Sequence, residues 1–122
     1  MSNYYFDFNT TVVLGDDLDL SWTITDDNGD AVDISGWTWF YTAKSDRTAE
    51  DASADLIYED TDFTISSNTA SLTLLDTDTD DLTAGSEYHQ DLQILDADSK
   101  VRTLGVGRLK VVNRVTKRIA AL

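Results

Sequence analysis

Residues 18–25 alternate strictly between apolar and polar side chains, beginning with Leu18 and ending with Thr25. Successive side chains of a β-strand point to opposite faces, so this pattern predicts a strand with one dry and one wet face. The Asp, Asn and Gly residues of the next segment, 26–30, predict a turn, because they tolerate left-handed backbone or bond their own main chain. A strand that is dry on one face needs a second layer to cover it.

Short strands of this kind recur along the chain, and no segment shows a convincing helical period. The longest polar stretch, residues 45–54, predicts a mobile loop. Residues 66–68 predict the turn of a hairpin. About seven short antiparallel strands with turns every 8 to 12 residues indicate an all-β, immunoglobulin-like two-sheet sandwich. Besides residues 18–25, the predicted strands are residues 37–44, 56–58, 63–65, 70–74, 88–95 and 101–112.

Two local features refine this prediction. Gly105 and Gly107 interrupt the last strand, which indicates a bulge or a close approach of another backbone. Tyr88 begins the penultimate strand behind Leu82 and Gly85, an arrangement typical of a tyrosine corner. The hydroxyl of such a tyrosine bonds back to the main chain at the crossover between the sheets.

The length of 122 residues fits one domain, 1–122, and no more. Cysteine is absent, so packing has to hold the fold without disulfides. No apolar run approaches the roughly 20 residues that cross a bilayer, and the first residues lack the pattern of a secretory signal. We therefore expect a protein made in the cytoplasm of a cell.

Charge divides the chain into an acidic body and a basic end. Residues 1–98 carry all 23 acids against two bases, whereas residues 99–122 carry seven bases and no acid. An acidic body repels nucleic acid and anionic membranes, so neither is an expected partner. Abundant Asp and scarce Lys keep a surface hydrated at high ionic strength, which makes a salt-loving host one interpretation.

The order and spacing of several motifs resemble a known family. These motifs are residues 15–17, 26–29, 32–38, 88–95, 96–103 and 107–111. The sequence is similar to the small immunoglobulin-like domains of tailed-virus virion proteins, including the N-terminal domain of phage baseplate upper proteins. The resemblance covers residues 13–116 and implies a structural protein of the virion, in the tail, baseplate, neck or head. It implies other virion proteins and further copies of the same chain as partners, with no enzymatic activity.

Catalytic and metal sites are the alternatives to a binding role. The single histidine, His89, has no recognisable nucleophile or orienting acid, so we expect a surface histidine and no enzyme. Calcium is the more serious alternative, because four acids fall at positions 1, 3, 5 and 12 of an EF-hand-like spacing. The sixth position lacks the required glycine, and a solvated acidic loop is the preferred interpretation. The four acids are Asp76, Asp78, Asp80 and Glu87.

Aromatic residues and the two ends supply the candidate binding residues. Trp22, Trp37, Trp39 and Tyr41 could form a sugar-stacking platform, but their alternate positions favour a core. Phe40 points the other way and is predicted to face a partner. Residues 1–9 are predicted to form an N-terminal arm or edge strand, and residues 114–122 a basic C-terminal arm. The candidate protein-binding residues are Tyr4, Tyr5, Phe6, Phe8, Phe40, Arg114, Lys117, Arg118, Ile119 and Leu122.

The expected function is therefore structural, in a virion, with no cofactor. The runner-up is a carbohydrate-binding or calcium-stabilised adhesion module. Aromatic platforms and acidic loops would have to be exposed for that second function, whereas the first requires exposed sheet faces, edges or arms.

Overall fold

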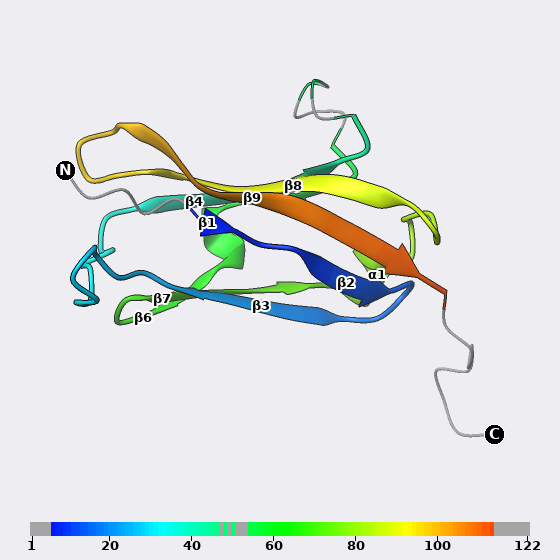
Figure 1. Cartoon of the computed structure of the whole chain (residues 1–122), viewed down its shortest axis with the longest axis horizontal. Helices are drawn as coiled ribbons and strands as arrows, with labels where there is room; N and C mark the ends of the chain where they lie inside the picture. The colour runs from blue at the N-terminus through cyan, green and yellow to red at the C-terminus, as the bar shows by residue number, and fades with distance from the viewer. Residues whose placement is uncertain (1–5, 47, 49, 51–53, 114–122) are drawn as a thin grey trace.

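The computed structural model describes residues 6–46, 48, 50 and 54–113, and shows a two-layer all-β sandwich (Figure 1). The larger layer, sheet A, has the strand order β1-β9-β8-β4-β5, with β2 also paired to β9. The smaller layer, sheet B, has the order β3-β7-β6. Sheet A contains β1 (Phe6–Asp7), β2 (Thr10–Val13), β4 (Thr38–Lys44), β5 (Leu56–Tyr58), β8 (Glu87–Leu95) and β9 (Val101–Val112). Sheet B contains β3 (Leu18–Thr23), β6 (Thr64–Ser66) and β7 (Thr69–Leu74).

This topology confirms the predicted immunoglobulin-like sandwich. The alternating segment forms β3, and its inward side chains, Leu20 and Trp22, are buried while Asp19 and Ser21 are exposed. The predicted hairpin joins β6 to β7, with Ser67 in the left-handed region at a φ of 55°. Two short helical turns, η2 (Asp60–Asp62) and α1 (Asp76–Thr79), lie in the connections. No helix in the described residues is long and apolar enough to cross a membrane.

The first two strands add parallel pairing to an otherwise antiparallel sandwich. Phe6 of β1 pairs with Gly105 of β9, and Thr10 of β2 pairs with Leu109 of β9. Between them the backbone N–H of Phe8 donates to the carbonyl of Val106 at 2.9 Å. The N-terminal segment predicted as an arm or edge strand is therefore, from Phe6 onward, an edge strand of this domain itself.

The core lies between the two sheets and is largely aromatic at its centre. Trp39 and Tyr41 of β4 are fully buried, and Trp22 of β3 packs against Tyr41 with ring centroids 6.5 Å apart. Phe63 contacts Trp22 and Trp39 with centroid distances of 6.2 and 5.9 Å. These aromatic residues fill the core, as alternation predicts.

Both glycines of β9 have the predicted role. The register between β8 and β9 shifts after Leu92. Leu92 pairs with Gly105, but the next residue, Gln93, pairs with Thr103. Leu104 therefore has no partner on β8 and forms a bulge. A side chain at Gly107 would overlap the backbone carbonyl of Phe8. Only a glycine at this position lets the segment between β1 and β2 lie so close to β9.

The tyrosine corner is confirmed. Tyr88 is buried at the start of β8, and its hydroxyl accepts the backbone N–H of Thr83 at 2.9 Å. The left-handed Gly85, at a φ of 85°, lies in the turn between them. This bond ties the crossover from sheet B to the centre of sheet A.

Replacing Tyr88 with Phe should lower the free energy of unfolding by about 1–2 kcal/mol, since it leaves the N–H of Thr83 without its acceptor while keeping the ring. Urea denaturation measures this difference. Tyr88→Phe with unchanged stability would show that the hydroxyl bond is not a structural tie.

Candidate functional site

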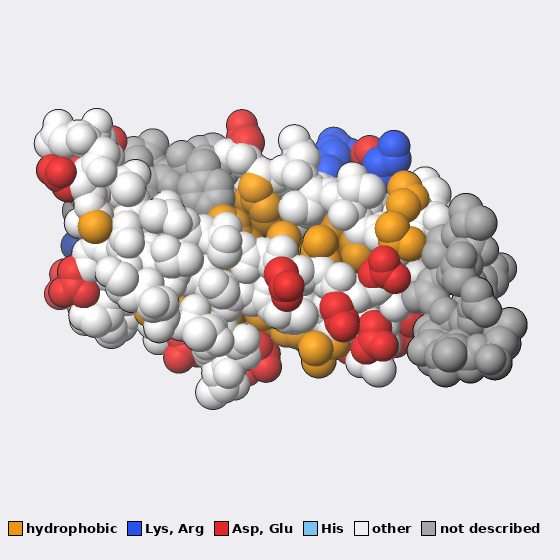
Figure 2. Space-filling view, turned by 90° about the horizontal axis from the view of Figure 1, so that it is seen from below, with side chains coloured by type: hydrophobic (Ala, Val, Ile, Leu, Met, Phe, Trp, Pro, Cys, Tyr) orange, Lys and Arg blue, Asp and Glu red, His pale blue; other side chains and the backbone are white. Residues whose placement is uncertain are grey.

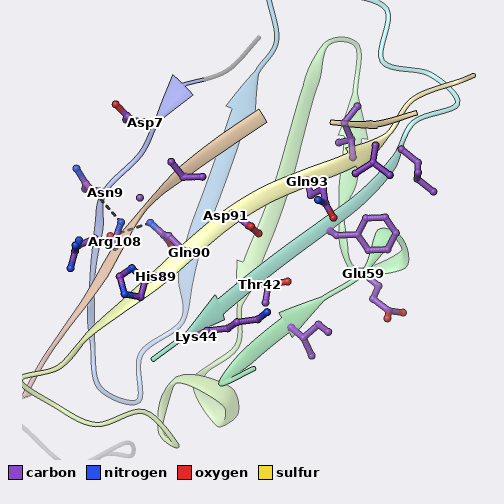
Figure 3. A pocket seen from close by; sticks show the side chains of 17 residues that line it. Asp7, Asn9, Thr42, Lys44, Glu59, His89, Gln90, Asp91, Gln93 and Arg108 are labelled. Carbon is purple, nitrogen blue, oxygen red and sulfur yellow. Dashed lines mark hydrogen bonds between the residues drawn. The ribbon is translucent and has the colours of Figure 1, made fainter. Parts of the chain in front are cut away.

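The outer face of sheet A is hollowed. An open depression of about 870 Å³ lies across the strands, lined by side chains of β4, β5, β8 and β9 and by Asp7 of β1 (Figure 3). It exists because β8 and β4 alternate strictly, which sends every second side chain outward. Short polar residues such as Thr42 occupy the middle of the face, and longer residues surround them.

Strand register arranges the residues of this face in transverse rows. Lys44 pairs with His89, and His89 pairs with Arg108, so three basic residue types lie side by side across β4, β8 and β9. In Figure 3 these three side chains gather at one end of the depression. The next row joins Thr42 to Asp91. We refer to Lys44, His89 and Arg108 as the basic row.

Acidic groups flank the basic row without filling it. Arg108 lies 3.5 Å from the carboxylate of Glu87, and both side chains are more than half exposed. Hydrogen bonds from Thr48, and more weakly the charges of His89 and Lys44, hold the pKa of Asp46 below its ordinary value. Like charges on directly opposite positions of a sheet destabilise it slightly, so folding alone does not favour a basic row.

The other end of the depression is apolar. Phe40 lies on the outer side of β4, opposite to Trp39 as alternation predicts, and is partly buried; its contact with a partner stays a prediction. Val101 of β9 is 64% exposed at this end, whereas Ile57 of β5, which is 51% exposed, pairs with Thr42 in the middle of the face. Leu95 completes this end. A face with an apolar end, a polar middle and a charged rim has the composition of a protein-binding surface.

A buried polar cluster fixes the sheet beneath this face. Gln90 is 2% exposed and points into the core from β8. Its amide nitrogen donates to the carbonyls of Phe8 and Arg108, both at 3.1 Å, and to the hydroxyl of Thr10 at 3.0 Å. Its amide oxygen accepts the hydroxyl hydrogen of Tyr41 at 2.7 Å. Burial raises the pKa of Tyr41, which keeps the hydroxyl protonated as a donor.

The structure assembles some predicted binding residues and not others. Phe40 faces outward at the depression, whereas Phe8 packs edge-to-face on Trp22, 5.7 Å between centroids, and so belongs to this domain's own core. The backbone of Phe6 is in β1. The side chain of Phe6 and all of Tyr4, Tyr5, Arg114, Lys117, Arg118, Ile119 and Leu122 lie outside the described residues and stay predictions.

The calcium-site hypothesis is corrected. Asp78 accepts the hydroxyl of Tyr58 at 2.6 Å, and Glu87 turns to Arg108 instead. In the turn of helix α1, Asp78 is two residues from both Asp76 and Asp80, so its carboxylate does not share a face with theirs. Among the described residues no three acids, histidines or cysteines are grouped to hold a metal.

The sugar-platform hypothesis is also corrected. Trp39 and Tyr41 have no exposed surface and Trp22 is 7% exposed. Trp37 is partly buried against Trp39, with ring centroids 5.8 Å apart. Stacking on a sugar ring needs an exposed aromatic face, which Trp22, Trp39 and Tyr41 do not offer.

The turn between β8 and β9 closes one end of the face and depends on Asp96. One carboxylate oxygen of Asp96 accepts the backbone N–H groups of Asp98 and Lys100 at 2.9 and 3.0 Å, and the other accepts Nε of Arg102 at 3.0 Å. The bonds from Lys100 and then Arg102 hold the pKa of Asp96 below its ordinary value of 3.8.

Stability should depend on pH through this carboxylate. Because the folded state lowers the pKa of Asp96, its contribution is complete above 3.8 and is lost as the pH falls through the folded-state value. Below 3.8, the unfolding free energy of the wild type should fall more steeply with decreasing pH than that of Asp96→Asn. Urea denaturation of both proteins over a pH series measures the two unfolding free energies. Unfolding free energies that fall in parallel with pH would contradict the role of Asp96.

Comparison with known proteins adds no family. No protein-family model matches the chain, and no curated protein matches it. The class of protein is therefore given by its own geometry, which is an immunoglobulin-like β-sandwich with a hollowed, mixed-polarity outer face on sheet A.

Proposed function

We propose that this protein is a structural component of a tailed-virus particle that acts by binding neighbouring proteins through the outer face of sheet A. The single observation that supports binding there is the depression, which combines an apolar end with the basic row. The placement in a virion is supported by the resemblance of its ordered motifs to virion domains.

The binding role also agrees with the chemistry of the described residues. His89 stands between two cationic side chains in the register, and the nearby acid Asp46 is bonded to Thr48. That the protein is not an enzyme stays a prediction. Within residues 6–46, 48, 50 and 54–113, no observation favours the sugar- or calcium-binding alternative, since Trp22, Trp39 and Tyr41 are buried and no three acids are grouped to hold a metal.

Mass spectrometry of gradient-purified tailed particles from the source organism tests this proposal. We expect peptides of this chain in amounts comparable to those of other structural proteins. We expect Ile57→Asp, which places a charge on an exposed apolar residue at the β5 side of the face, to reduce incorporation into particles strongly.

Ile65→Asp is the matched control. Ile65 is 43% exposed on β6 of sheet B, so the same charge is introduced away from the depression. Particles without this chain would contradict the virion placement. Equal incorporation of both variants would contradict the assignment of the face.

A further inference from the structure

The border strand β3 of sheet B has an open edge. Sheet B has the order β3-β7-β6, so in the part of the chain that the structure describes no strand pairs with the second side of β3 (Figure 1). β3 has six residues in continuous register with β7, whereas the border strands β5 and β6 have three residues each. The remaining border, on sheet A, is divided into β1 and β2. A long open edge is a template for pairing with another strand.

The register with β7 shows which backbone groups lie on this edge. Ile24 N–H donates to the carbonyl of Asn68 at 2.9 Å, one residue beyond the pair that Thr23 makes with β7. In an antiparallel ladder hydrogen-bonded and non-hydrogen-bonded pairs alternate, so Thr23 is in a non-hydrogen-bonded pair and turns its N–H and C=O away from β7. The same holds at every second residue before it, which are Ser21 and Asp19. These three residues therefore present backbone donors and acceptors on the open side.

β3 lacks the features that protect the borders of native sheets. Such borders are usually short, bulged, or interrupted by proline or lysine, and β3 has none of these features. Its one charged residue, Asp19, accepts the hydroxyl of Thr73 at 2.6 Å, and the hydroxyl of Thr23 lies 3.0 Å from that of Thr69. Both outward side chains are thus held toward β7, which leaves the backbone of the edge accessible.

The sequence of β3 matches itself in the antiparallel direction. A register centred on Ser21 brings the edge-facing groups of two copies together at all three residues. In this register Ser21 faces Ser21 of the second copy, and Asp19 faces Thr23. On the inner side, Leu20 faces Trp22. Polar residues thus meet polar residues, apolar residues meet apolar residues, and no acid of the strand lies opposite another acid.

We infer that a second copy of this chain binds this edge, so that two β3 strands pair antiparallel about a two-fold axis at Ser21. The three strands of each sheet B then form one continuous sheet across both copies. A two-fold contact uses the same surface on both copies and closes on itself, so the product is a dimer. This inference goes beyond the proposed function, because it uses the border of sheet B and not the outer face of sheet A.

Charge opposes this contact and determines how it depends on salt. Each copy has a net charge of −14, and on the sheet B side Asp and Glu are spread over the surface while Lys and Arg appear only at the rim (Figure 2). Antiparallel pairing also brings the exposed Asp16 and Asp17, before β3, toward the exposed Asp27 beyond the end of β3 in the second copy. The screening length falls from about 8 Å at 0.15 M salt to about 3 Å at 1 M. We therefore expect association to strengthen by about tenfold or more between these two conditions.

Sedimentation equilibrium of the purified full chain at 0.15 M and 1 M salt tests the inference. The wild type should approach the mass of a dimer and no more, with the tighter association in 1 M salt. Ser21→Pro removes an N–H that points away from β7, a position at which a border strand tolerates proline. This variant should weaken association by about tenfold or more, while urea denaturation shows that it is folded.

Ile65→Pro is the matched control, on the opposite border of sheet B. The N–H of Ile65 also points away from β7, since Ser71 turns its backbone groups away from β3 and pairs with the preceding residue, Thr64. This variant should associate like the wild type.

A pair of charged variants tests the two-fold axis, at which residue 21 meets itself. At 0.15 M salt, Ser21→Asp and Ser21→Lys should each weaken association by about tenfold, because each places like charges opposite one another. A mixture of the two variants should restore a dimer with one copy of each, since a carboxylate then faces an ammonium group. The same two substitutions at Ser66, which is exposed on β6, should leave association unchanged.

Four outcomes would overturn the inference. They are a wild type that stays monomeric at every concentration in both salt conditions, association that weakens with added salt, a folded Ser21→Pro variant that associates as tightly as Ile65→Pro, and a mixture of the charged variants that stays monomeric. Ile57→Asp, which changes the outer face of sheet A, should dimerise like the wild type. The dimer and the proposed function are therefore tested separately.

Discussion

Gly107→Ala should destabilise the protein by about 3 kcal/mol, although alanine is usually tolerated in a strand. The added carbon would overlap the carbonyl of Phe8, so the segment between β1 and β2 has to move away from β9. That movement would break the bond from Phe8 N–H to Val106 and the bond from Arg108 N–H to the Asn9 side chain, both 2.9 Å. Urea denaturation gives the loss of stability.

Amide hydrogen exchange shows where Gly107→Ala acts. Protection should fall at Phe8 and Leu14, whose N–H groups bond to β9, while the amides between β4 and β8 keep theirs. The control is Thr103→Ala, at an exposed position of the same strand, which should change stability by less than about 0.5 kcal/mol. An equal loss of stability in the two variants would show that the segment between β1 and β2 does not lie against Gly107 as described.

Gln90→Leu should cost about 3–5 kcal/mol even though leucine is apolar and similar in size. It leaves the carbonyls of Phe8 and Arg108 and the hydroxyl of Tyr41 without the partner that they have in the core. A buried polar group without a partner costs about 1–3 kcal/mol. Chemical denaturation measures the total loss in the free energy of unfolding.

A double-mutant cycle with Tyr41→Phe isolates the bond between the two side chains. The double variant should be more stable than the sum of the single losses predicts, because Gln90→Leu already removes the acceptor of Tyr41. Gln93→Leu is the matched control, since Gln93 lies on the same strand but faces the depression. A loss at Gln90 no larger than at Gln93 would contradict the cluster.

Local patterns were sufficient to predict most of the fold. Alternation predicted β3, β4 and β8, and the residue types of the turns separated β6 from β7, because burial on one face imposes a period of two. The tyrosine corner was visible as a spacing of Leu82, Gly85 and Tyr88. Gly107 indicated a close approach, but its partner, Phe8, is about a hundred residues away in the chain and local pattern carries no information on such pairing.

The candidate site was harder to predict than the fold. Phe40 could be assigned to the outer face from its position between Trp39 and Tyr41. The basic row could not, because Lys44, His89 and Arg108 come from three strands and meet only through the register. Gln90 carried a signal that was overlooked, since a polar residue on the inward face of a strand has to find partners in the core. The acid spacing at 76–87 suggested calcium because sequence spacing does not show side-chain direction.

Lysine acetylation of intact particles, compared with the free chain, tests the central claim that partners bind on the outer face of sheet A. Lys44 lies in the depression, and Lys100 is exposed in the β8–β9 turn, so one chain contains both the probe and its control. We predict that Lys44 loses most of its reactivity in the particle while Lys100 keeps its own. Equal reactivity of Lys44 in the particle and in the free chain would contradict the claim.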